Sequence, residues 1–240
     1  MRRTFEVVYN QNSLRLLLGE TLEVMDELKP GIFDLCITRP PTIHQQPLAY
    51  KSFIYAVYMA VDRLLSPGGY FVVNFTDEHT DCSMLPMQAL HSSAGIACCD
   101  LQLVGTRIVI KRHENHSAPR YVRESSMHLI DYEYAWTWRK AGPHKDRTNN
   151  IKCSTSGIIG EGWKQPVVLD KGSKSFPIEF PLHMMRIYAK SSSKSLILDP
   201  FVGIGTTLLA AKHLGHNCVG IDNNQQHLNF AKQRIEHPYQ

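Results

Sequence analysis

The residues with the clearest chemical pattern lie in the stretch LILDPFVGIGTTLLAAKHLGHNCVGID, at positions 196–222. A short apolar run ends at Asp199, and two glycines, Gly203 and Gly205, lead into a helical pattern. Glycines let the backbone pass close to a ligand, and a helix start offers unpaired N–H groups at the positive end of its dipole. Asp222 ends the next apolar run 17 residues after Gly205, near the offset of about 20 at which an acidic residue binds ribose hydroxyls. The pattern predicts a nucleotide-type pocket in a strand–helix–strand unit.

The type of nucleotide follows from what this loop lacks. A dinucleotide fingerprint has a third glycine where this sequence has Leu208, and a Walker loop needs a lysine that is absent here. The pattern D-P-F-x-G-x-G-T-T, which ends at Thr206 and Thr207, therefore suits a ligand without a pyrophosphate. S-adenosyl-L-methionine, an adenosine joined to a sulfonium amino acid, is such a ligand and is the predicted cofactor.

A second stretch, CITRPPTIH at positions 36–44, predicts a functional loop. Pro40 and Pro41 follow an apolar run typical of a buried strand. A proline pair ends a strand and stiffens the loop after it, because proline lacks an N–H and fixes φ. The loop also carries the polar residues Arg39 and Thr42. Ligands of open α/β sheets bind at the carboxyl ends of strands, so we expect this loop to face the ligand.

Length and composition restrict the class of protein. A chain of 240 residues, 43% of them hydrophobic, can form one large α/β domain, and no run of about 18 apolar residues predicts a membrane span. The six cysteines form no C-x-x-C pair, and Cys36, Cys98 and Cys218 lie in apolar runs typical of buried free thiols. We therefore expect an intracellular protein, cytoplasmic or nucleoid-associated in a prokaryote, with no metal site and no membrane partner.

The net charge of +4 is mildly basic, and the basic residues gather in two places. Between Arg107 and Arg123 the sequence has five lysines and arginines against Glu114 alone. The segment 141–175 is polar and lacks sustained periodicity, which indicates either a functional loop or a flexible exposed insertion. Such surfaces suit a phosphate backbone. The predicted nucleic-acid contacts are Lys111, Arg112, Arg120, Arg123, Lys145, Arg147, Lys152 and Lys164.

Hydrophobic periodicity predicts alternating strands and helices. The expected strands are Phe33–Thr38, Tyr70–Phe75, Gln102–Lys111, Tyr132–Trp138, Leu196–Leu198 and Cys218–Ile221. The expected helices are Thr21–Leu28, Tyr50–Leu65, Met84–Ala94, Leu182–Ala189, Thr206–Leu214 and Gln225–Glu236. This alternation indicates a doubly wound α/β fold, a mostly parallel sheet with helices on both faces. The third and fourth strands have no clear helix between them and are expected to pair as an antiparallel hairpin at one edge, and Ser66–Gly69 is expected to form a turn.

The motifs resemble those of the amino-group DNA methyltransferases, which modify N4 of cytosine or N6 of adenine. DPFVGIGTT with VGID resembles the cofactor motif of this family, and FDLCITRPPT lies where the family has its catalytic strand and loop, usually T-S-P-P-Y or D-P-P-Y. Four further segments are similar: LRLLLGETLEVMDEL, RLLSPGGYFVVN, YEYAWTWRKAG and SFPIEFPLHMMRIYA. The catalytic loop precedes the cofactor loop, which is the order of the β class.

The resemblance implies a single methyltransferase domain over residues 1–240, with a Rossmann-like sheet of seven strands and a target-recognition loop inserted at 141–175. It implies S-adenosyl-L-methionine as cofactor and double-stranded DNA as partner, with the target base flipped out, as in restriction–modification. The class often dimerises, so a homodimer or heterodimer is expected. The implied cofactor-binding residues are Glu20, Thr38, Phe176, Pro177, Asp199, Pro200, Phe201, Gly203, Gly205, Thr206, Thr207 and Asp222.

The catalytic loop implied by the resemblance is Arg39, Pro40, Pro41 and Thr42. In the family, the first of these residues and the carbonyl of the first proline accept hydrogen bonds from the target amine. The last is an aromatic residue that stacks on the flipped base. This sequence departs at both variable positions, because arginine has only donors and threonine has no ring.

Three interpretations follow from this departure. The chain is an active methyltransferase with an altered loop, or a DNA- or cofactor-binding subunit that has lost its chemistry, or a methyltransferase that acts on RNA or another substrate. Thr38 precedes the loop as in T-S-P-P-Y, which favours cytosine N4 over adenine N6. Arg39 has two further expected roles, binding a phosphate or pairing with a carboxylate such as Asp34.

Overall fold

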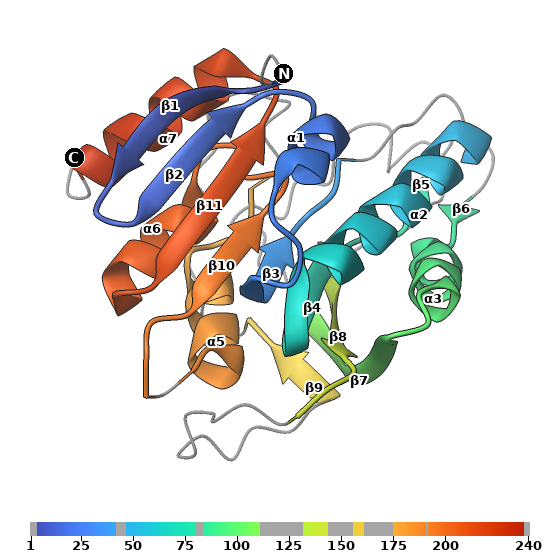
Figure 1. The fold of residues 1–240 in the computed structure, drawn as a ribbon. Coiled ribbons are helices and arrows are strands. Elements are labelled where there is room, and N and C mark those ends of the chain that lie inside the picture. Colours follow the sequence, from blue (N-terminus) through green and yellow to red (C-terminus); the bar gives the residue numbers. More distant parts are fainter. Residues whose placement is uncertain are drawn as a thin grey trace, which may run out of the picture.

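The computed structural model describes residues 4–41, 47–79, 84–110, 132–143, 156–160, 175–190 and 192–237. Strands and helices alternate along most of this length, as the sequence predicts, and form an α/β fold with a central sheet (Figure 1). No helix in the described ranges is long and apolar enough to span a membrane.

The elements of the fold come from the whole length of the chain. The strands are β1 (Glu6–Gln11), β2 (Leu14–Leu18), β3 (Phe33–Thr38), β4 (Leu65–Phe75), β5 (Glu78–His79), β6 (Met84–Leu85), β7 (Leu101–Ile110), β8 (Tyr132–Lys140), β9 (Ser156–Ile159), β10 (Leu196–Asp199) and β11 (Asn217–Asp222). The helices are α1 (Thr21–Glu27), α2 (Pro47–Leu64), α3 (Met87–Ala97), α5 (Glu179–Tyr188), α6 (Thr206–Leu214) and α7 (Gln225–Glu236).

The main sheet has nine strands, in the order β1-β2-β11-β10-β3-β4-β8-β7-β9, where seven were expected. β2, β11, β10, β3 and β4 run parallel to their neighbours in this order, and β9 runs parallel to β7. β8 runs antiparallel between β4 and β7, and β1 antiparallel to β2. The predicted antiparallel pairing of β7 with β8 is therefore present. It does not lie at the edge of the sheet, because β9 pairs with β7 and is the edge strand. The unpredicted strands of this sheet, β1, β2 and β9, are short or strongly polar. β5 and β6, which were not predicted either, form a separate two-stranded sheet.

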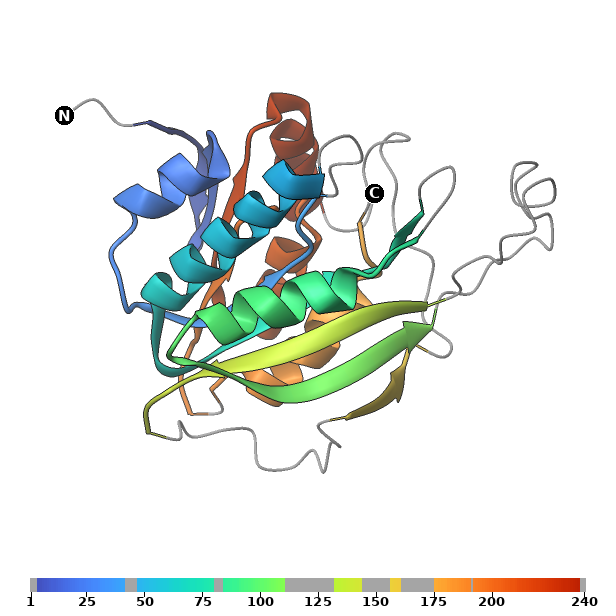
Figure 2. The ribbon, with the colours of Figure 1, turned by 90° about the vertical axis from the view of Figure 1, so that its right-hand side faces the viewer.

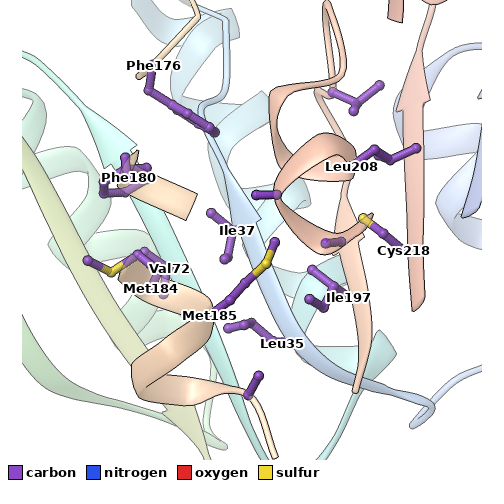
Figure 3. Packing of buried hydrophobic residues seen from close by; sticks show 14 of the residues in the cluster. Leu35, Ile37, Val72, Phe176, Phe180, Met184, Met185, Ile197, Leu208 and Cys218 are labelled. Atoms are coloured by element: carbon purple, nitrogen blue, oxygen red, sulfur yellow. The ribbon is translucent and has the colours of Figure 1, made fainter. Parts of the chain in front are cut away.

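One half of the core lies between the sheet and the helices α5, α6 and α7. Ile37 of β3 and Val72 of β4 point to this face, where Met184 and Met185 of α5 pack against them (Figure 3). All four side chains are at most 1% exposed. Full burial of each such side chain contributes about 1.5–3 kcal/mol, so α5 is firmly held on the sheet.

The other half of the core lies under α1, α2 and α3. Cys36 and Phe71 alternate with the residues of the first face and point to this second one, because successive side chains of a strand point to opposite sides. Tyr58 of α2 packs edge-on against Phe71 and Trp138, with ring centroids 4.9 and 5.9 Å away. Figure 2 shows α3 running beside the long strands β7 and β8. Helices on both faces confirm the doubly wound arrangement.

Two local predictions were wrong. Ser66–Gly69 does not form a turn between separate elements but lies within β4, where the register with β3 passes from Phe33–Leu65 to Leu35–Tyr70. Met84 belongs to β6, and α3 begins later, at Met87. Pro86 precedes that helix, and the carboxylate of Asp77 accepts the Met87 N–H at 2.8 Å, which supplies the cap.

Candidate cofactor and catalytic site

Asp199, at the end of β10, is the polar centre of the site. Its side chain is buried and accepts three hydrogen bonds, from Thr38 Oγ1 at 2.6 Å, Thr207 Oγ1 at 2.5 Å and the Phe201 N–H at 3.1 Å. Thr38 ends β3, Thr207 lies in the first turn of α6, and β3 and β10 are adjacent parallel strands. The structure therefore brings the proline loop and the glycine loop together at one carboxylate.

Burial raises the pKa of Asp199 from its ordinary value of 3.8 to about 6, and the charge of Asp222 adds to the rise. The hydrogen bonds from Thr207, Thr38 and Phe201 act in the opposite direction, because they stabilise the ionised form. A cation beside this carboxyl would also favour ionisation. The site is thus suited to a positively charged ligand, such as a sulfonium.

The two glycines of the loop have different surroundings. Gly203 has a φ of +50°, and a Cβ at this position would meet nothing within 4 Å. Gly205 has a φ of +80°, and its Cβ would lie only 2.7 Å from the Cβ of Ala231 in α7. Gly203 is therefore the glycine beside open space, where a ligand can approach the backbone, whereas Gly205 allows α6 to pack closely on α7.

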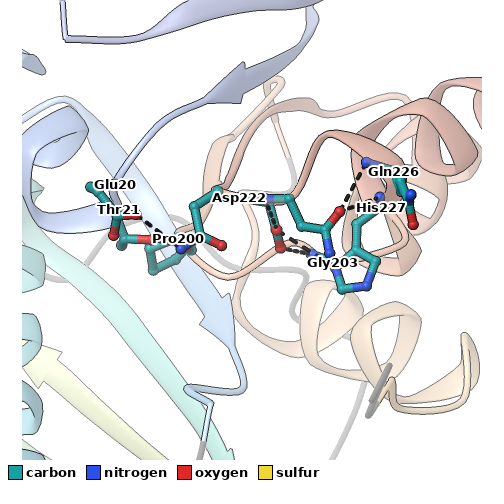
Figure 4. Close-up of polar contacts among 9 residues, drawn as sticks. Glu20, Thr21, Pro200, Gly203, Asp222, Gln226 and His227 are labelled. Carbon is teal, nitrogen blue, oxygen red and sulfur yellow. Dashed lines mark hydrogen bonds and ion pairs between the residues drawn. The ribbon is translucent and has the colours of Figure 1, made fainter. Parts of the chain in front are cut away.

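Asp222 organises the same loop from the end of β11 (Figure 4). Its Oδ2 accepts the Gly203 N–H at 2.9 Å and its Oδ1 accepts the Asn224 N–H at 2.8 Å. The ring Nδ1 of His227 lies 3.6 Å from Oδ1. A carboxylate has about four acceptor positions, so Asp222 can still bind ribose hydroxyls.

The start of α1 is joined by one hydrogen bond to the glycine loop and by another to the residue after β11 (Figure 4). Thr21 Oγ1 donates to the carbonyl of Pro200 at 3.0 Å, and Glu20 Oε1 accepts from Asn223 Nδ2 at 3.1 Å. Glu20 is exposed, so a ligand can reach its carboxylate. Glu20 therefore lies next to the end of β11, close to Asp222.

The Phe176–Pro177 segment lies beside the start of α6. The hydroxyls of Ser175 and Thr206 are 2.9 Å apart, and the Phe176 ring packs against Phe180, with centroids 5.0 Å apart. On the opposite side of the loop, Phe201 meets Phe53 of α2 edge-on at 5.7 Å. Aromatic side chains thus fix both flanks of the loop.

Arg39, the residue before the two prolines, pairs with a carboxylate, which was one of its expected roles, but the partner is not the one named from the sequence. Its Nη1 lies 2.7 Å from Oε1 of Glu133 in β8, and the side chains are 14% and 6% exposed. Asp34, the partner considered from sequence, instead lies 3.0 Å from Nζ of Lys190 and accepts the Leu196 N–H at 3.1 Å. The expected pairing with Asp34 was wrong, because Asp34 lies near the amino end of β3 and Arg39 follows its carboxyl end.

Several predicted site residues lie outside the described ranges. Thr42 is one, and the predicted nucleic-acid contacts Lys111, Arg112, Arg120, Arg123, Lys145, Arg147, Lys152 and Lys164 are the others. Arg107, taken from sequence as the start of a basic strip for DNA, is buried at 2% exposure and donates to the Tyr188 hydroxyl at 2.7 Å. That part of the prediction was wrong, since Arg107 points to the core face under α5.

Three residues of the site were missed from sequence. Glu133 is a single acidic residue in a strand of aromatic neighbours, and an unexplained charge in such a strand is the signal that could have revealed it. Asn224 accepts the N–H groups of Gln226 and His227 and caps α7. Asparagine before a helical pattern is a known start signal. Arg234 of α7 donates to Thr206 Oγ1 of α6 at 3.1 Å, a contact between residues 28 positions apart that no local pattern indicates.

Comparison with known proteins gives a consistent result. A family model described as DNA methylase, for N6 and N4 methyltransferases, matches residues 33–233. The type II methyltransferase M.SmaI of Serratia marcescens is 40% identical, over 94% of this chain and 92% of that protein. The fold is similar to that of the cytosine-N4-specific PvuII DNA methyltransferase, with a TM-score of 0.78 and 16% identity over 92% of this chain and 86% of the other. It is also similar to M1.HpyAVI in its complex with SAM, with a TM-score of 0.65 and 20% identity over 92% and 98% of the two chains.

Proposed function

The chain belongs to the N6/N4 DNA methylase family, and on that basis we propose that it methylates N4 of cytosine in double-stranded DNA. As a member of this family it is a DNA amino-methyltransferase that uses S-adenosyl-L-methionine. The proposal concerns the target atom, the flipping of the target base and the residues that act on it.

The observation that carries the proposal is the hydrogen bond between Thr38 and Asp199. It joins the loop that receives the target base to the loop that receives the cofactor, at a distance of 2.6 Å. A methyl group can pass directly between two bound molecules only when they are held within contact distance and in line. The adjacency of these loops therefore supports direct transfer, without a covalent intermediate on the protein.

The residues of the glycine loop fit the proposed cofactor. The buried Asp199 carboxyl is suited to the positively charged methionine end, and the open space at Gly203 lets the ligand approach the backbone. Asp222 has acceptor capacity for the ribose hydroxyls, and the exposed Glu20 for the adenine amine. S-adenosyl-L-methionine supplies an activated methyl group on its sulfonium.

Two observations favour cytosine N4 over adenine N6. Thr38 occupies the position of the threonine in T-S-P-P-Y, and its hydroxyl is committed to Asp199. The PvuII enzyme, whose fold this chain resembles over nearly its whole length, is cytosine-N4-specific. The exocyclic amine of a paired base is engaged in the duplex, so the target must be flipped out before it can react.

The experiment is methylation of unmodified genomic DNA with labelled cofactor, followed by digestion to nucleosides and separation by liquid chromatography with mass detection. We expect N4-methylcytosine as the labelled product. Label in N6-methyladenine would contradict the proposed target, and label in neither would contradict the proposed function. An Asp199→Asn variant serves as the negative control, since it removes the charge at the centre of the site.

Flipping of the target base is a further proposal. DNA whose target cytosine is replaced by a mismatched or abasic position should bind more tightly than the intact duplex, because less unstacking energy is then needed for flipping.

Dimerisation, which is common in the β class, is also proposed. It is tested by sedimentation of the purified protein with and without DNA.

A further inference from the structure

The residue before the two prolines holds a buried carboxylate. Arg39 Nη1 lies 2.7 Å from Oε1 of Glu133, and both side chains are largely withdrawn from water. Taking two charges out of water is costly unless the pair is well formed. A neutral pair of similar volume would avoid the free energy of desolvating two charges. The presence of the charges therefore suggests a role in chemistry.

The sheet places this carboxylate at the edge where ligands bind. β8 runs antiparallel to β4, and the last pair of that ladder joins Phe75 to Tyr134, so Glu133 lies just beyond the carboxyl end of β4. Arg39 directly follows the carboxyl end of β3, which runs parallel to β4. Glu133 therefore lies at the same edge of the sheet as the proline loop and Thr38.

The position before the two prolines lacks the side-chain acceptor that the family has there. An arginine has five donors and no acceptor, so Arg39 cannot accept a hydrogen bond from the target amine. A carboxylate accepts such bonds at about four positions and needs only one of them for the amine. We propose that Glu133 is the catalytic acceptor for the target amine and that Arg39 is its positioning residue, an inference that rests on the proposed function.

Glu133 acts on the target amine before and after methyl transfer. The carboxylate accepts a hydrogen bond from one N–H of the exocyclic amine, which directs the nitrogen lone pair toward the methyl carbon. The nitrogen lone pair forms a bond to that carbon while the carbon–sulfur bond breaks. The electron pair of the broken bond stays on sulfur, which becomes a neutral thioether. The methylated nitrogen then carries one excess proton, which passes to the Glu133 carboxylate and from there to water.

The competing explanation is that the pair only stabilises the fold. The double variant Arg39→Met with Glu133→Gln separates the two roles, because it removes both charges of the ion pair together. A matched control is available at the other end of β8, where Lys140 Nζ lies 3.3 Å from Oδ1 of Asp62. The control double variant is Lys140→Met with Asp62→Asn.

We expect the Arg39→Met, Glu133→Gln variant to fold and to bind the cofactor with unchanged affinity by calorimetry. Its kcat should fall about 100-fold, the scale of losing one preorganised stabilising contact, while KM for DNA changes little. The control pair should keep the kcat of the wild type. A kcat for the Glu133 variant within a few-fold of wild type would overturn the inference.

A second set of variants keeps the test valid if the neutral pair fails to fold. Glu133→Asp retains the charge but withdraws the carboxylate by one methylene, so kcat should still fall. Arg39→Asp with Glu133→Gln places an acidic residue directly before the prolines, as in D-P-P-Y, and should recover at least 10-fold of the lost rate. Wild-type activity in Glu133→Asp together with no recovery in the rescue pair would exclude a catalytic role.

The outcomes of this test and of the proposed function are distinct. If the wild type labels N6-methyladenine, the proposed target fails, but the same variants still decide the role of Glu133 with that base. If the wild type labels N4-methylcytosine and the variants match it, only the Glu133 inference fails. If the wild type transfers no methyl group to DNA, both fail.

Discussion

The Thr38 hydroxyl and the Asp199 carboxylate are 161 positions apart in the chain and 2.6 Å apart in the buried centre of the site. One comes from the strand before the proline loop and the other from the strand before the glycine loop. A hydrogen bond between these strands fixes the relative position of the two loops.

Replacing Thr38 by valine should weaken both the fold and the cofactor site. A hydrogen bond to a charged group contributes about 1.5–3 kcal/mol, and the Asp199 carboxylate would keep only its other two donors. We expect a loss of unfolding free energy on that scale in urea titrations and weaker cofactor binding by calorimetry. Thr38→Ser, which retains the hydroxyl, is the control, and an equal loss in that variant would show that the hydroxyl is not responsible.

Cofactor affinity should fall as the pH drops through about 6. Burial raises the pKa of Asp199 to about 6, and a cationic ligand binds the ionised form better, so binding at pH 5.5 should release a proton. Calorimetry in two buffers with different heats of ionisation measures this release. Asp199→Asn should show no such proton release, and a wild type that binds without it would contradict the assigned role.

The raised pKa of Asp199 also affects the stability of the fold. This effect decreases with rising pH, whereas the cofactor affinity increases. Between pH 3.8 and 6 the folded protein holds a proton on Asp199 that the unfolded chain has lost. The contribution of this group to the free energy of unfolding therefore decreases as the pH rises through that window. Asp199 thus stabilises the fold less at neutral pH than it does near pH 4.

His91 should make the protein sensitive to acid. Its ring is buried, stacks on Phe75 with centroids 4.0 Å apart and lies 3.1 Å from the Tyr58 hydroxyl. Burial lowers the pKa of His91 from 6.5 to about 3, so below pH 6.5 the unfolded chain gains a proton that the folded protein excludes. The resulting loss is about 2 kcal/mol at pH 5. Denaturation curves at pH 7 and 5 should show this loss of unfolding free energy in the wild type and a smaller loss in His91→Phe. An equal loss between the two pH values in both proteins would refute the assignment.

The two loop glycines should respond differently to alanine. At Gly203 the added methyl enters open space that the ligand needs, and the positive φ adds roughly 1–2 kcal/mol of strain. At Gly205 the methyl collides with Ala231. We expect Gly203→Ala mainly to weaken cofactor binding and Gly205→Ala mainly to lower the melting temperature. The pair serves as its own control, and the reverse pattern would contradict the assignment of Gly203 to the ligand.

The sequence was most informative where local rules apply. The run from Leu196 to Asp222 contains a strand, a glycine turn, a helix and a second strand, and each is set by neighbours a few positions away. The limits of α6 and α7 were predicted to the residue. Cys36, Cys98 and Cys218 are buried free thiols, as their apolar surroundings indicated.

Pairing between distant segments was not predictable in the same way. β9 has four residues and gains its place only by pairing with β7, and β1 depends on β2. The partner of Arg39 followed from the position of β8 beside β4, which no spacing in the sequence encodes. Arg107 was misassigned for a similar reason, because a strand in a covered part of the sheet can bury an arginine that composition places on the surface.

The central position of β10 has a consequence for synthesis of the chain in the cell. β10 pairs with β3 through Leu35 and Ile197, so a ribosome releases β3 long before its neighbour exists. Throughout that interval one backbone edge of a buried strand is open to other chains, a condition that promotes aggregation of nascent proteins. A translation product that stops before residue 196 would therefore be a substrate for chaperones and proteases rather than merely an inactive enzyme.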